Sequence, residues 1–115
     1  MSIATAAPLY RLFHSPGACS LAPHIALEML AETCGVNWEP VRVVIADGAN
    51  RKPEYLAINP RGRVPALSFR AADGSEQILT ESTAILLFLA QRHPEAGLLP
   101  SEPTALVRSI ETLSW

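Results

Sequence analysis

Hydrophobic positions along the chain alternate between short apolar runs, typical of strands, and the three- and four-residue spacing of amphipathic helices. Residues 9–13 form a short apolar run that ends at the turn residues 15–17, which predicts a strand followed by a tight turn. After this turn Leu21, Ile25 and Met29 recur at four-residue spacing, and two further leucines widen the stripe. The pattern predicts an amphipathic helix directly after the first strand.

Pro23 limits where this helix can begin. Proline is accepted in the first turn of a helix, because the N–H groups there have no intrahelical partner, but it breaks a helix further along. The helix therefore begins close to Cys19 or Ser20. Gly35 is placed to end it in the left-handed conformation that closes many helices.

The middle of the chain predicts one more strand, a short helical segment and a hairpin. Residues 38–45 are rich in valine and isoleucine and predict a second strand. Residues 53–58 predict one or two irregular helical turns. Two apolar runs, 66–69 and 77–79, flank the turn residues 72–75 and predict a β-hairpin.

The last third of the chain predicts a complete helix and the start of another. Residues 80–82 resemble a helix start, and the helix runs to about Arg92. Its interior, 85–89, is apolar nearly all round, so we expect it to be covered on more than the side that faces the sheet. Residues 94–103 hold three prolines and predict an interdomain linker, and 104–115 show a further helical stripe.

Composition narrows the classes of protein. Hydrophobic residues make up 49% and charged residues 17% of the chain, which is typical of a globular domain. The net charge of -2 gives no reason to expect nucleic acid or an anionic membrane as a partner. The longest apolar run, 84–90, is far too short to span a membrane. Residues 1–8 lack a basic n-region, and we interpret them as a frayed extension.

The two cysteines are expected to be free thiols. If the first helix separates Cys19 from Cys34, the two lie about 20 Å apart at a rise of 1.5 Å per residue, whereas a disulfide needs Cα atoms within roughly 7 Å. Free thiols fit a reducing compartment, most simply the cytoplasm. At a helix N-terminus, orphan N–H groups and the helix dipole favour the reactive thiolate, so Cys19 is the candidate reactive group. Cys34 is interpreted as a small hydrophobic residue.

Other polar residues near Cys19 admit two interpretations each. His14 is either a base or hydrogen-bonding neighbour of Cys19, or a partly exposed residue at the end of a strand. Ser20 is interpreted as the N-cap of the first helix, with a second hydroxyl beside the thiol as the alternative. His24 fits surface packing and His93 fits a helix C-terminus. The three histidines have no metal-ligand spacing, so no metal site is expected.

The predicted order, β-α-β-α-β-β-α with Cys19 at the first strand–helix turn, is the thioredoxin-like α/β arrangement. Three motifs, residues 15–25, 59–67 and 79–85, resemble the signatures of bacterial beta-class glutathione transferases. The resemblance extends over residues 9–100, which would be the N-terminal glutathione-binding domain. It implies a thioredoxin-like unit over 9–93, a linker over 94–103, and the first turns of an all-helical domain over 104–115.

The resemblance also implies a binding site for glutathione. Val64 and Pro65 match the family's cis-proline junction, where the backbone of Val64 would pair with the cysteinyl part of glutathione. Glu81 would meet the γ-glutamyl ammonium group. Ser82 and the N–H groups of its helix would hold the adjacent carboxylate. Cys19 would then lie beside the glutathione sulfur.

Several positions in this site have a second interpretation. Glu81 and Ser82 also form an ordinary helix start, and Pro65 can be a plain turn proline. The lysine that the family commonly places after the second strand is replaced near Asp47, so Arg51 or Lys52 would serve the glycyl carboxylate instead. The arginines at positions 61 and 63 are interpreted as a solvated loop face.

Two functions follow as hypotheses. The first is a glutathione transferase, or its glutathione-binding domain, that uses glutathione as co-substrate for conjugation to a small electrophile or for monothiol exchange with a disulfide through Cys19. Cys19 has no second cysteine in a C-x-x-C arrangement, which argues against dithiol chemistry. The second is a non-catalytic glutathione-binding or protein-interaction module. In this family a helical C-terminal domain completes the electrophile site and supports a homodimer, which is expected of the full-length form.

Overall fold

The computed structural model describes residues 8–16 and 20–113. The predicted Cys19 and nearly all of the predicted N-terminal extension lie outside these residues. The described elements are, in chain order, β1 Tyr10–His14, α1 Leu21–Cys34, β2 Trp38–Arg42, the 3-10 turns η1 Ile45–Asp47 and η2 Ala49–Arg51, α2 Pro53–Leu56, β3 Ala66–Arg70, β4 Glu76–Thr80, α3 Ser82–Arg92, the 3-10 turn η3 Pro94–Ala96 and α4 Pro103–Leu113. This order agrees with the predicted β-α-β-α-β-β-α succession followed by a further helix.

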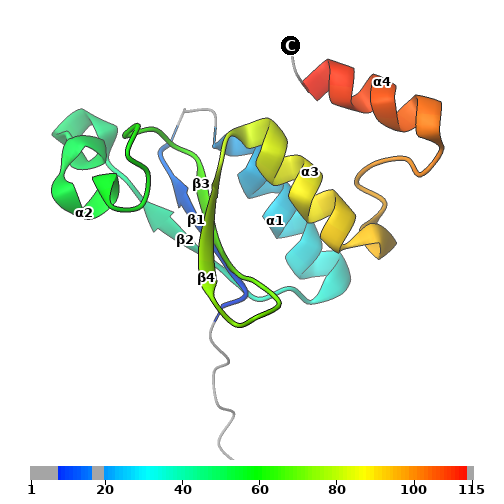
Figure 1. The fold of residues 1–115 in the computed structure, drawn as a ribbon, viewed down its shortest axis with the longest axis horizontal. Helices are drawn as coiled ribbons and strands as arrows, with labels where there is room; N and C mark the ends of the chain where they lie inside the picture. The colour runs from blue at the N-terminus through cyan, green and yellow to red at the C-terminus, as the bar shows by residue number, and fades with distance from the viewer. Residues whose placement is uncertain (1–7, 17–19, 114–115) are drawn as a thin grey trace, which may run out of the picture.

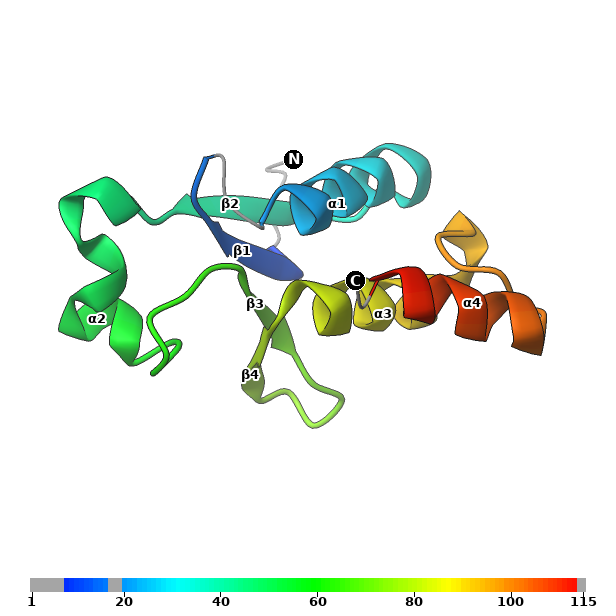
Figure 2. The ribbon, with the colours of Figure 1, turned by 90° about the horizontal axis from the view of Figure 1, so that it is seen from above.

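The four strands form one mixed sheet in the order β2-β1-β3-β4. β1 pairs in parallel with β2 and antiparallel with β3, and β4 pairs antiparallel with β3 as the predicted hairpin. Figures 1 and 2 show α1 and α3 next to each other on one face of the sheet and α2 on its other side. β1 and β3 are the two inner strands, and each contributes side chains to the core beneath these helices.

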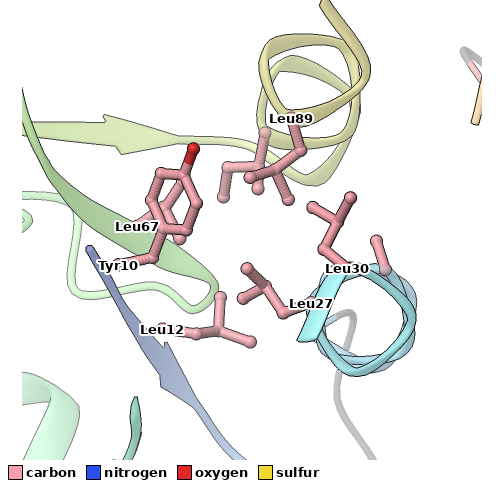
Figure 3. Close-up of a cluster of buried hydrophobic side chains, with 8 residues drawn as sticks. Tyr10, Leu12, Leu27, Leu30, Leu67 and Leu89 are labelled. Atoms are coloured by element: carbon pink, nitrogen blue, oxygen red, sulfur yellow. The ribbon is translucent and has the colours of Figure 1, made fainter. Parts of the chain in front are cut away.

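The hydrophobic core lies between the sheet and the helices α1 and α3 (Figure 3). The two leucines of α1 that widen the predicted stripe, Leu27 and Leu30, are fully buried there. They face Leu12 of β1, Leu67 of β3 and Leu89 of α3, which are also fully buried. Truncating one such leucine to alanine typically costs about 2–5 kcal/mol, so this cluster holds the two helices on the sheet.

The exposed face of α1 differs from what its four-residue stripe suggests. Leu21, Ile25 and Met29 are 63%, 51% and 47% exposed, while Pro23 and Ala26 face the core with the two leucines. The spacing predicted the helix correctly but not its buried side. The reason is that α1 is apolar on two sides, and periodicity alone does not tell which of them packs on the sheet.

The second strand is shorter than predicted. β2 ends at Arg42, opposite His14, the last residue of β1. The N–H of Val43 still donates to the carbonyl of His14 at 2.7 Å, and the chain then turns into η1 and η2. Residues 43–45 therefore do not extend β2 in spite of their strand propensity, because a strand continues only where a partner strand is present to pair with it.

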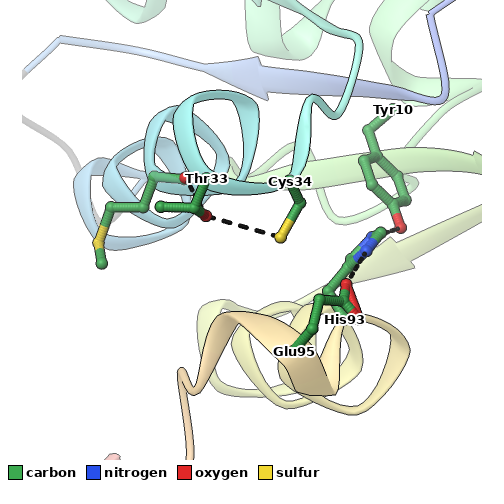
Figure 4. A network of polar contacts seen from close by, with 6 residues as sticks. Tyr10, Thr33, Cys34, His93 and Glu95 are labelled. Carbon is green, nitrogen blue, oxygen red and sulfur yellow. Dashed lines mark hydrogen bonds and ion pairs between the residues drawn. The ribbon is translucent and has the colours of Figure 1, made fainter.

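A buried polar contact joins the start of β1 to the end of α3 (Figure 4). Tyr10 is fully buried, and its hydroxyl shares a hydrogen bond of 2.7 Å with Nε2 of His93. Nδ1 of His93 lies 3.5 Å from Oε1 of Glu95. Burial raises the pKa of the Tyr10 phenol, against the opposing charge of Arg92. The phenol is therefore protonated at neutral pH and fixes the C-terminal end of α3 on the sheet.

α4 is attached to the rest of the fold by limited contacts. The hydroxyl of Thr83 donates to the carbonyl of Leu113 at 3.0 Å, which joins the end of α4 to the first turn of α3.

Of the predicted apolar interior of α3, Ile85 and Leu89 are fully buried, and the three residues between them are half-buried. Within residues 8–16 and 20–113, no helix is both long and apolar enough to cross a membrane. The division into domain, linker and further helical segment stays a prediction.

Replacing Tyr10 by phenylalanine tests the contact with His93. Loss of the hydroxyl leaves the imidazole without this partner, and we expect the free energy of unfolding to fall by about 1–2 kcal/mol. Urea denaturation of Tyr10→Phe, followed by circular dichroism, measures the change. Thr33→Val is the matched control, because it removes an exposed hydroxyl that donates within α1. Equal stability of Tyr10→Phe and the unsubstituted chain would contradict the role given to this bond.

Candidate functional site

The loop between α2 and β3 is organised by the side chain of Asn59. Asn59 is 3% exposed. Its Oδ1 accepts the N–H of Arg61 at 3.1 Å, and its Nδ2 donates to the carbonyl of Arg63 at 2.9 Å. The hydroxyl of Tyr55 also donates to this carbonyl, and burial raises the pKa of Tyr55 more than its hydrogen bond with Asn59 lowers it. One buried amide therefore fixes the backbone of the loop at two points.

Gly62 brings the same loop against η2. Its φ of 65° lies in the left-handed region, and a Cβ at this position would come within 2.9 Å of the backbone oxygen of Asn50. The side-chain amide of Asn50 donates to the carbonyl of Gly62 at 2.8 Å. This close approach leaves no room for a side chain and holds the residues on either side of Gly62 in place.

Replacing Gly62 by alanine tests this close approach. Gly74 provides a matched control, since its φ is also positive, at 86°, but a Cβ there would meet no atom within 4 Å. The left-handed conformation alone costs a non-glycine residue about 1–2 kcal/mol. We expect Gly74→Ala to lower the free energy of unfolding by this amount and Gly62→Ala to lower it by clearly more, both measured by urea denaturation. Equal losses in the two variants would contradict the contact with Asn50.

Glu81 has a backbone conformation that an ordinary helix start does not require. Its φ is 75°, and it is the non-glycine residue with positive φ within the described ranges. It occupies the N-cap position of α3, yet its side chain makes no capping hydrogen bond. Such a conformation costs on the order of 1–3 kcal/mol and is found most often at functional sites. Glu81 therefore stands at the start of α3, as the helix-start interpretation expects, but its side chain does not cap the helix.

The carboxylate of Glu81 faces the loop across the start of α3. Its Oε1 lies 3.7 Å from Nη1 of Arg61, and the two side chains are 64% and 73% exposed. The exposed pair is worth little as a source of stability. It does show that the loop and the first turn of α3 come within reach of one ligand.

A cavity of about 260 Å³ lies between this loop and the first turn of α3. The residues that line it are Asn59, Arg61, Arg63, Val64, Pro65, Thr80, Glu81, Ser82 and Thr83. The four binding residues predicted on either side of the hairpin, Val64, Pro65, Glu81 and Ser82, thus meet in one place, and the peptide bond between Val64 and Pro65 is cis.

The N-terminus of α3 gives the cavity a second feature. α3 has eleven residues, and its first intrahelical bond runs from the N–H of Ile85 to the carbonyl of Glu81 at 3.0 Å. The N–H groups of the first turn of a helix have no partner within the helix and carry the positive end of its dipole. A negatively charged group of a ligand is therefore favoured beside Ser82.

Two charged residues of the cavity, Arg61 and Arg63, were not predicted to belong to it. They were interpreted as a solvated loop face, and both are exposed, but both also line the cavity. The Asn-Pro-x-Gly pattern at 59–62 is the signal that could have indicated this, because an asparagine in a turn commonly bonds to the backbone two residues on. Arg51 and Lys52, which were predicted to serve the glycyl carboxylate, are exposed on η2 and at the start of α2 and are not part of the described lining.

Ser20 is the N-cap residue of α1, as predicted, and its carbonyl accepts the N–H of His24 at 3.1 Å. Its side chain makes no capping hydrogen bond to α1. Instead its Oγ accepts the N–H of Ser15 at 3.2 Å and donates to the carbonyl of Ser15 at 3.1 Å, and both serines are buried. The hydroxyl thus serves the buried backbone of Ser15, whose polar groups need partners. Since Cys19 lies outside the described residues, a hydroxyl beside its thiol stays a prediction.

His14 is half-buried at the end of β1, next to other aromatic rings. Its ring centroid lies 5.2 Å from that of His24, which in turn lies 5.2 Å from that of Trp38. Burial lowers the pKa of His14, and the charges of His24 and Arg42 lower it further. A neutral imidazole at neutral pH is compatible with either predicted role. Among residues 8–16 and 20–113, no three His, Cys, Asp or Glu side chains are grouped to hold a metal ion.

The fold is that of a known family. Residues 25–92 match the family described as "Glutathione S-transferase, N-terminal domain". The chain belongs to this family, and the thioredoxin-like α/β fold expected from its sequence is confirmed.

Individual relatives agree with this assignment. Glutathione S-transferase GstA of Escherichia coli O157:H7 is 37% identical over 106 residues, which cover 91% of this chain and 48% of the relative. Maleylacetoacetate isomerase of Pseudomonas aeruginosa is 35% identical over 102 residues, 87% of this chain and 43% of the relative. A glutathione transferase homologue from Sulfitobacter, solved with bound glutathione, superposes with a TM-score of 0.74 at 44% identity, over 88% of this chain and 45% of that one. The chain thus spans about half the length of the relatives it matches.

Proposed function

We propose that this chain binds glutathione in the cavity between residues 59–65 and the first turn of α3, as the glutathione-binding part of a beta-class glutathione transferase. One observation carries the proposal. A single cavity is lined by two separate segments of the chain, Val64 and Pro65 on one and Glu81 and Ser82 on the other. The presence of glutathione in the Sulfitobacter homologue, 44% identical to this chain, supports the same ligand.

Each part of the tripeptide has a chemically suitable partner. The backbone of Val64 pairs with the cysteinyl part, as one strand pairs with another. The carboxylate of Glu81 attracts the γ-glutamyl ammonium group, and the first turn of α3 at Ser82 attracts the neighbouring carboxylate. In this proposal the glutathione sulfur points toward Cys19, which lies two positions before the first residue of α1 in the sequence.

Two reactions are open to a site that holds glutathione, or its disulfide, in this way. In conjugation, the sulfur of the glutathione thiolate attacks an electrophilic carbon, a C–S bond forms, and the leaving group departs with its electron pair. In exchange, the thiolate of Cys19 attacks one sulfur of a glutathione disulfide, so that a Cys19–glutathione disulfide forms and one glutathione thiolate leaves. The substrates are therefore a small electrophile or a disulfide.

The relatives suggest how a longer form of this protein would be built. The relatives are about twice as long as this chain. We propose that the full-length form adds a helical domain after the linker at 94–103, completes the electrophile site with it, and acts as a homodimer in the cytoplasm. The helical start at 104–115 belongs to that domain in this proposal.

Replacing Glu81 by glutamine tests the binding site. The change keeps the size of the side chain but removes the charge that attracts the ammonium group, and we expect the dissociation constant for glutathione to rise about tenfold. Isothermal titration calorimetry measures it on the 115-residue chain. Glu111→Gln is the matched control, because Glu111 is exposed on α4 and pairs with Arg108. Unchanged affinity in Glu81→Gln would refute the site, and absence of binding to the unsubstituted chain would refute the ligand.

Replacing Cys19 by alanine tests the exchange reaction. The unsubstituted chain incubated with oxidised glutathione is expected to form a mixed disulfide, detected by intact-protein mass spectrometry, and Cys19→Ala is expected to lose it. Cys34→Ala is the control and should react like the unsubstituted chain, since Cys34 packs partly buried against the core. Mixed-disulfide formation at an unchanged rate in Cys19→Ala would contradict this role.

A further inference from the structure

The charged residues that line the cavity follow a definite pattern. Arg61 and Arg63 come from the loop, and Glu81 comes from the start of α3. The described lining therefore offers two positive groups and one negative group. Glutathione at neutral pH carries the opposite set, two carboxylates and one ammonium group, so each charge of the ligand has one complementary side chain in the cavity.

Arg61 lies beside Glu81, the residue proposed to bind the ammonium group of glutathione. Its guanidinium is 3.7 Å from the carboxylate of Glu81, and both side chains are more than half exposed. Exposed ion pairs contribute little, so each partner can exchange the other for a ligand group at low cost. The γ-glutamyl head carries an ammonium and a carboxylate on the same carbon. It would therefore satisfy Glu81 and Arg61 together.

Arg63 lies two residues further along the same loop. The backbone carbonyl of Arg63 accepts hydrogen bonds from the amide of Asn59 and the hydroxyl of Tyr55. Arg63 directly precedes Val64 in the chain. Its side chain is exposed yet lines the cavity. A peptide paired with the backbone of Val64 would thus have Arg63 within reach of its second carboxylate. Guanidinium groups suit this role, because they bind carboxylates through two parallel hydrogen bonds.

We propose that Arg61 binds the γ-glutamyl α-carboxylate of glutathione, beside Ser82, and that Arg63 binds the glycyl carboxylate. This proposal rests on the proposed function and assigns the second role to Arg63 in place of Arg51 or Lys52. The loop is prepared for this role, because Asn59 fixes the backbone on both sides of Gly62 and leaves only the two long side chains to adjust.

The test pairs each arginine with the ligand group it is assigned. The ligands are glutathione, an analogue in which hydrogen replaces the α-carboxylate (γ-aminobutyryl-cysteinyl-glycine), and the glycine amide of glutathione. Isothermal titration calorimetry gives their dissociation constants for the unsubstituted chain, Arg61→Gln and Arg63→Gln. We expect Arg61→Gln to weaken glutathione about tenfold but to leave the affinity for the analogue without an α-carboxylate unchanged. Arg63→Gln should likewise weaken the binding of glutathione about tenfold and leave the affinity for the glycine amide of glutathione unchanged.

Controls separate these effects from general loss of positive charge. Arg108→Gln removes an arginine on α4 whose side chain is 75% exposed and should bind all three ligands normally. Circular dichroism verifies the fold of each variant, which we expect to be kept because the loop is held through its backbone. Arg51→Gln and Lys52→Gln test the alternative carboxylate partners.

Three results would overturn the proposal. The first is unchanged glutathione affinity in Arg61→Gln or Arg63→Gln. The second is a loss of equal size for all three ligands, and the third is a loss confined to the glycyl carboxylate in Arg51→Gln or Lys52→Gln. In each case glutathione still binds the unsubstituted chain, so the proposed function survives. Absence of binding to the unsubstituted chain would overturn both.

Discussion

The buried side-chain amide of Asn59 is the interaction on which the arrangement of the cavity depends. It accepts from the backbone of Arg61 and donates to the backbone of Arg63, so the loop keeps one shape without help from a ligand. The approach of Gly62 to η2 adds a second constraint on the same loop. As a result, the backbone of Val64 and two arginine side chains are presented together, and a ligand has little conformational entropy to remove.

The opposite wall of the cavity is positioned by the hydrophobic core. Burial of Ile85 and Leu89 fixes α3 on the sheet, and the contact between Tyr10 and His93 fixes its far end. Glu81 is the one residue between the end of β4 and the first residue of α3, and the chain passes from strand to helix there with a positive φ of 75°. The strain at Glu81 is small compared with what the core contributes, so a fold of this kind can hold a costly backbone conformation at its binding site.

Sequence patterns predicted the elements and four of the residues that line the cavity. The order of strands and helices followed from periodicity and turn residues, and the motifs around Val64 and Glu81 correctly indicated residues that meet. Local patterns carry no information on what happens when a partner strand ends or which apolar side of a helix is covered, and β2 and α1 were therefore partly mispredicted. Ser20 was correctly predicted at the N-cap of α1, but the bonds of its hydroxyl to Ser15 were not, because buried backbone groups of the preceding turn cannot be counted from sequence. The place of Arg61 beside the cavity likewise depends on a contact between distant segments.

Occupation of the cavity between the loop and the start of α3 by glutathione can be tested directly by nuclear magnetic resonance. The backbone amide resonances of the isotopically labelled chain are followed while glutathione is added. If glutathione binds there, the largest shifts fall on residues 59–65 and 80–83, which hold the lining of the cavity on its two sides. Shifts centred on α4 or on the β3–β4 turn, with the amides of these two segments unchanged, would contradict it.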